Sequence, residues 1–72
     1  PSDGNLFLKN NREGGETYIK VIDIQGINVY EKNIYLESKQ VVSLELNHVV
    51  TGVYFVEIHQ SKHSETLMIS VN

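Results

Sequence analysis

The stretch that decides the fold is Gly52-Val53-Tyr54-Phe55-Val56-Glu57-Ile58, followed by a polar turn at Ser61-Lys62-His63 and a last segment, Ser64 to Val71. Both segments alternate with a period of two, and the side chains expected on the inward faces are Tyr54, Val56, Ile58, Leu67, Ile69 and Val71. Two alternating segments joined by a tight polar turn predict an antiparallel β-hairpin. Because the chain finishes on this hairpin, we expect a module appended to a longer protein that carries the activity elsewhere.

The two-residue period runs through the rest of the chain as well. It predicts short strands at residues 6–8, 17–24, 27–34 and 42–46, with residues 35–40 as a connection or a weak edge strand. The further side chains expected on inward faces are Val42, Leu44, Leu46 and Val49. In the strand at residues 17–24, Ile19 and Val21 share one face, and Tyr18, Lys20 and Ile22 share the other. No helical period occurs. The chain is therefore predicted to be all-β, a small Greek-key or immunoglobulin-like β-sandwich of about six or seven antiparallel strands.

A turn and a corner between the predicted strands contain residues with predicted conformational roles. Asp23 is expected to accept hydrogen bonds from nearby backbone N–H groups, and Gly26 to supply a positive φ angle in the same turn. Tyr54 is expected to anchor the core, with its hydroxyl group reaching the corner that precedes it.

Size and composition limit the classes of function. The chain has 72 residues, a formal net charge of −3 and no cysteine. It forms one domain that would bury roughly 60% of its extended surface, so nearly every apolar residue is needed for the core. This favours a binding, structural or sorting role over catalysis.

The basic residues of the chain are scattered, so no nucleic-acid partner is expected. No run of about 18 apolar residues predicts a membrane helix, and Pro1 is expected to be an internal point of a longer precursor.

Residue chemistry gives no strong candidate for a catalytic, cofactor or metal site. His59 and His63 bracket the final turn, but a zinc ion would need further ligands, and only Glu57 and Glu65 are near in sequence. Residues 61–64 place serine beside histidine, but neighbours in a tight turn diverge and no carboxylate is placed to orient the histidine. We expect no enzyme, no cofactor, no metal and no small-molecule substrate.

Four motifs follow one another along the chain. The first is Pro1 to Leu8, and the second is Ile19 to Gly26 with its Asp-x-x-Gly ending. The third is Leu44-Glu45-Leu46 with Val49, followed by Gly52 to Ile58, which looks like a Leu-x-x-Gly-x-Tyr strand, and the fourth is the last strand at the end of the chain. In this order they resemble the type A C-terminal sorting domain, or Por secretion tail, of the Bacteroidetes type IX secretion system. The resemblance covers essentially all 72 residues.

The resemblance implies that residues 1–72 are a single sorting domain at the C-terminus of a longer secreted precursor, with a cargo domain on its N-terminal side. Such a protein crosses the periplasm, engages the outer-membrane translocon and reaches the cell surface or the medium, and a cell-surface sortase removes the domain. The motif residues would be Asp23, Gly26, Gly52, Tyr54 and Lys62. Gly52 and Tyr54 would shape the corner, and the translocon would read the Lys62 turn and the last strand.

An alternative from another class is a small adhesive or carbohydrate-binding β-sandwich of a surface protein. A sugar-binding face needs two or three aromatic side chains on one sheet surface. Tyr18 and Tyr30 could supply them if both lie on the outer face of the hairpin formed by residues 17–34.

Overall fold

The computed structural model describes residues 4–72, which form six β-strands and no helix. The strands are β1 (Asn5–Lys9), β2 (Gly15–Asp23), β3 (Asn28–Leu36), β4 (Val41–Glu45), β5 (Gly52–Gln60) and β6 (His63–Val71). None of the described residues belongs to a helix able to cross a membrane. Pro1, with which the first motif begins, lies outside the described residues.

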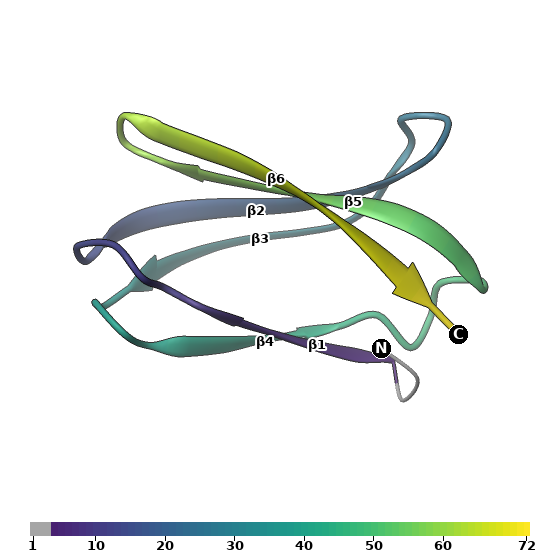
Figure 1. The fold of residues 1–72 in the computed structure, drawn as a ribbon, viewed down its shortest axis with the longest axis horizontal. Helices are drawn as coiled ribbons and strands as arrows, with labels where there is room; N and C mark the ends of the chain where they lie inside the picture. The colour runs from purple at the N-terminus through teal and green to yellow at the C-terminus, as the bar shows by residue number, and fades with distance from the viewer. Residues whose placement is uncertain (1–3) are drawn as a thin grey trace.

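The strands form two antiparallel sheets that face each other (Figure 1). β1 and β4 make a two-stranded sheet, and the other sheet has the order β3-β2-β5-β6. In the immunoglobulin scheme, β1 and β4 correspond to strands B and E, and β3-β2-β5-β6 to C′-C-F-G. The predicted small immunoglobulin-like sandwich is confirmed, with six strands.

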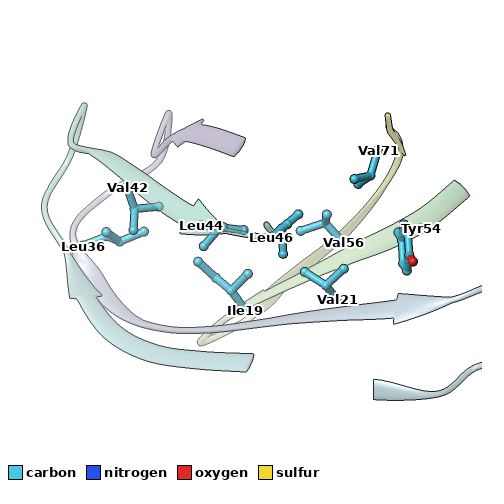
Figure 2. Packing of buried hydrophobic residues seen from close by; sticks show 9 residues of the cluster. All are labelled: Ile19, Val21, Leu36, Val42, Leu44, Leu46, Tyr54, Val56 and Val71. Atoms are coloured by element: carbon cyan, nitrogen blue, oxygen red, sulfur yellow. The ribbon is translucent and has the colours of Figure 1, made fainter. Parts of the chain in front are cut away.

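The core lies between the two sheets and follows the predicted alternation (Figure 2). The buried apolar side chains are Ile19, Val21, Leu36, Val42, Leu44, Leu46, Tyr54, Val56 and Val71. They come from five of the six strands and from the residue that follows β4. Val49, Ile58, Leu67 and Ile69 are partly buried against this cluster, as the sequence pattern predicts.

The main difference from the sequence prediction lies in β3. Residues 35–40 are expected as a connection or a weak edge strand, but Tyr35 and Leu36 continue β3, and Leu36 is only 4% exposed. Leu36 lies opposite Gly15, where β2 begins two residues earlier than expected. Pairing across the two strands continues the ladder through residues whose own composition favours a loop, because strand preference depends strongly on neighbouring strands.

Candidate functional site

The Asp-x-x-Gly motif forms the turn between β2 and β3. An Asp23 side-chain oxygen, Oδ1, accepts hydrogen bonds from the backbone N–H groups of Gln25 and Ile27, each at 2.9 Å. The Gly26 N–H donates to the Asp23 carbonyl at 3.0 Å, and Gly26 has a φ of 85°. Residues with a Cβ adopt this conformation only at an energetic cost. The predicted roles of Asp23 and Gly26 in shaping the turn are confirmed.

Gly52 and Tyr54 lie at the corner where the chain enters β5. The Tyr54 side chain is 4% exposed, and its hydroxyl donates a hydrogen bond of 2.6 Å to the Val50 carbonyl. This is the tyrosine corner of immunoglobulin-like folds, in which a tyrosine near the start of strand F bonds to the backbone a few residues upstream. Gly52 has a φ of 158°, at the boundary of the region that favours glycine. The predicted corner is present.

The five motif residues do not form one site. Asp23 lies directly opposite Tyr54 in the β2–β5 pairing, so the turn and the corner share one end of the four-stranded sheet. Lys62 lies in the turn between β5 and β6, at the other end of the nine-residue strand β5. At about 3.4 Å per residue, that strand spans roughly 30 Å. The structure therefore brings four of the motif residues together and places Lys62 far from them.

The edge of β6 is the more open edge of the four-stranded sheet. β6 pairs with β5 in unbroken register, and its residues from Thr66 to Val71 include no charged residue, proline or bulge. The opposite edge strand, β3, has a register shift opposite Val21 and Ile22 and carries Lys32 on the inward-facing side. Bulges and inward-pointing charges protect sheet edges against pairing with other chains. The second half of β6 lacks these features.

The outer face of the four-stranded sheet carries Tyr18. Its hydroxyl donates a 2.6 Å hydrogen bond to the Glu31 carboxylate, which raises the pKa of Tyr18, and its ring stacks on His59 with centroids 6.0 Å apart. Tyr30 lies on the opposite face of the sheet, because it is paired with the buried residue Val21. A sugar-binding face would need Tyr18 and Tyr30 on the same outer face, and this condition is not met, since the pleat sends them to opposite sides.

An apolar row, half-buried at Ile22 and Phe55 and exposed at Met68, crosses the same outer face. Phe55 lies opposite Ile22 on one side and opposite Met68 on the other, so the three side chains adjoin across β2, β5 and β6. Met68 is 71% exposed. The alternation predicts that Phe55 and Met68 point outward, but the row could not be recognised before the strand order was known.

The two histidines near the final turn do not converge. His63 is paired with Gln60, whereas His59 is paired with Ser64 one step further along the hairpin, so their side chains leave opposite faces. His59 contacts the Glu57 carboxylate at 3.3 Å. Across residues 4–72 there is no group of three or more His, Cys, Asp or Glu side chains that could hold a metal ion.

Asn10 is a structural residue that the sequence pattern does not reveal. Its amide nitrogen donates to the backbone carbonyls of Glu13, Leu36 and Glu37 at 3.0–3.4 Å. Its oxygen accepts hydrogen bonds from the Arg12 N–H at 3.1 Å and the Gln60 side chain at 3.4 Å. Asn10 is 7% exposed. This one side chain therefore joins the β1–β2 loop to the end of β3 and the end of β5.

Comparison with known proteins gives one result. The family model described as "Secretion system C-terminal sorting domain" matches residues 1–72, the whole chain. No curated protein and no solved structure matches it. The family match agrees with the all-β sandwich and with the four motifs in their order. The chain belongs to the family of secretion system C-terminal sorting domains.

Proposed function

We propose that this domain directs a cargo protein across the outer membrane through the type IX translocon and is then removed by a cell-surface sortase. Membership of a sorting-domain family over the whole chain is the observation that carries the proposal. The cargo lies on the N-terminal side of the domain. The precursor passes through the periplasm and ends at the outer-membrane surface or in the medium.

The domain works by recognition and not by catalysis. The final hairpin is the part that the translocon contacts, through the Lys62 turn and the edge of β6. Both are exposed: Lys62 lies in the exposed two-residue turn, and β6 has only one neighbouring strand among residues 4–72. A free strand edge can bind a partner by adding one of its strands.

The other four motif residues act by fixing the backbone conformation at one end of the domain. Asp23 and Gly26 hold the β2–β3 turn, and Gly52 and Tyr54 hold the corner that sets the direction of β5. They fix the start of β5, whereas the Lys62 turn lies at its far end. The adhesive alternative gains no support from Tyr18 and Tyr30, which face opposite sides.

The test is a fusion of residues 1–72 behind a signal peptide and a fluorescent reporter that is stable in the periplasm. In a host with the type IX system, we expect the reporter at the surface or in the medium, and its loss there when the translocon is disabled. Reporter trapped in the periplasm, with the domain folded, would contradict the proposal.

The role of the turn is tested by one substitution in the same fusion. Deleting residues 67–72 would not serve, because it removes the buried residue Val71 and unfolding alone could stop export. Lys62→Ser leaves the core intact and should lower the exported fraction about tenfold, the effect of losing a contact of roughly 1.4 kcal/mol. The control is Lys39→Ser, which removes the same charge from an exposed turn outside the hairpin. Equal export of both variants would exclude Lys62 from recognition.

A further inference from the structure

The two-stranded sheet leaves part of the larger sheet uncovered. Along the inward face of β6, Val71 is 3% exposed, Leu67 is half-buried, and Glu65 and His63 are exposed. Ile58, the partner of Glu65, is likewise only half-buried. The sandwich therefore opens progressively toward the β5–β6 turn, and Figure 1 shows β6 diverging from β1 in that direction.

A cleft of about 470 Å³ lies in this opening. Its walls are residues of β1 and of the first half of β6, and its floor is formed by the half-buried Ile58 above the buried core residues Ile19 and Val42. Leu67 from β6 and Leu8 from β1 add apolar surface on either side. The volume falls within the range of about 300–1,000 Å³ that is typical of binding pockets.

Phe7 and Lys9 of β1 direct their backbone groups toward this cleft. At the two ends of the strand, the Gly4 carbonyl accepts from the Leu46 N–H at 2.6 Å, and the Asn10 N–H donates to the Gln40 carbonyl at 2.8 Å. Gly4 and Asn10 thus both direct backbone groups toward β4 and its flanking residues. Because this direction alternates from residue to residue along an antiparallel strand, the even-numbered residues of β1 bond to β4 and the odd-numbered ones point away from it. The N–H and carbonyl groups of Phe7 and Lys9 therefore point away from β4, to the side where the cleft lies.

Two basic side chains line one end of the cleft. Lys9 and Arg12 line it where β1 ends, and neither forms an ion pair with a carboxylate of the described residues. Glu65 is the one carboxylate among the lining residues. This end is therefore suited to a negatively charged group.

We propose that the cleft accepts an extended peptide segment of another protein, paired antiparallel with β1. Its alternate side chains are apolar and fill the cleft over Ile58 and Leu67. An acidic residue near its N-terminal end lies beside Lys9 and Arg12, because an antiparallel partner begins where β1 ends. β1 corresponds to strand B of the immunoglobulin sandwich, and in that fold strand A pairs with the free edge of strand B. A peptide strand added to β1 would therefore take the place of strand A and extend the smaller sheet over β6.

The probe for the test is the capped heptapeptide Val-Asp-Val-Thr-Val-Thr-Val, titrated into the full 72-residue chain; its Asp lies on the face of the added strand that Lys9 shares, and its Val residues lie on the face toward the cleft. We expect amide shifts at Phe7, Lys9 and Leu67, and slower hydrogen exchange of the Phe7 and Lys9 amides at saturation. The edge of β3 should not respond. This measurement uses the unmodified chain and needs no variant. No binding at 1 mM peptide, or shifts centred on β3, would overturn the proposal.

Two substitutions at one position separate strand pairing from side-chain contact. Phe7→Pro and Phe7→Ala both remove the ring, but only proline removes the N–H that the added strand needs. Phe7→Pro should weaken peptide binding at least tenfold relative to Phe7→Ala. Equal affinities would exclude pairing with β1.

Ser43→Pro is the stability control for proline in this sheet. Ser43 lies directly opposite Phe7 and its N–H faces the outer edge of β4, so this variant should bind the peptide as the unmodified chain does.

Replacing Asp by Asn in the peptide should weaken binding and remove its salt dependence. If the chain self-associates and the Phe7 and Lys9 amides become protected without peptide, the occupant is a second copy and the peptide proposal fails.

Discussion

Asn10 connects three parts of the chain through one side chain. It bonds to the carbonyls of Leu36 and Glu37, 26 and 27 residues away, and to the side chain of Gln60, 50 residues away. Removing it leaves these partly buried polar groups without their partner. Leaving a buried polar group unsatisfied costs about 1–3 kcal/mol.

We therefore expect Asn10→Ala to lower the free energy of unfolding by about 2 kcal/mol, measured by urea denaturation. Asn11→Ala is the matched control, because Asn11 is exposed and is the next residue in the chain. Its effect should stay within about 0.5 kcal/mol. Equal effects of the two substitutions would mean that the Asn10 contacts contribute nothing to stability.

The role of Asn10 could not be predicted from the sequence. Asparagine in a polar loop is common for local reasons, because its side chain bonds to nearby backbone. Three of its five partners here, Leu36, Glu37 and Gln60, are distant in sequence and are brought to it by the packing of β3 and β5. Asp23 is the opposite case: its partners are two and four residues away, so the turn it forms could be predicted from local chemistry.

At the scale of the strands, alternation predicted which side chains face the core and missed where the strands end. Tyr54, Val56 and Val71 are buried as expected, since a strand sends alternate residues to one face. Leu36 was missed because polar residues follow it, while its pairing with Gly15 keeps the strand going. The cleft beside β1 also depends on strand order, which alternation does not specify.

The β2–β3 hairpin provides a test of backbone conformation with no change in packing. A Cβ added at Gly26 or at Gly15 would meet no atom within 4 Å, but only Gly26 has a positive φ, of 85°. Gly26→Ala should lower the free energy of unfolding by about 1–2 kcal/mol, the cost of that conformation for a residue with a Cβ. Gly15→Ala should be neutral or stabilising by up to about 1 kcal/mol. Thermal unfolding of both variants makes the comparison, and a neutral Gly26→Ala would contradict it.

At the scale of the whole molecule, the sandwich has two ends that are stabilised separately. One end holds the Tyr54 corner, and the other holds the network of Asn10 and Gln60. Tyr54 and Gln60 are six residues apart on β5, a separation of roughly 20 Å. No hydrogen bond described above is shared by the two ends.

The two ends should therefore contribute independently to stability. Tyr54→Phe removes the 2.6 Å hydrogen bond to Val50 and should cost about 1 kcal/mol. Combined with Asn10→Ala, the two losses should add within about 0.5 kcal/mol, as they do for distant sites without common partners. The control pair, Asn10→Ala with Gln60→Ala, shares a hydrogen bond and should depart from additivity by at least that amount. A large coupling free energy between Asn10→Ala and Tyr54→Phe in urea denaturation would contradict the independent stabilisation of the two ends. Additivity would instead mean that changes at the Tyr54 corner leave the energetics of the Asn10 and Gln60 network at the other end unchanged.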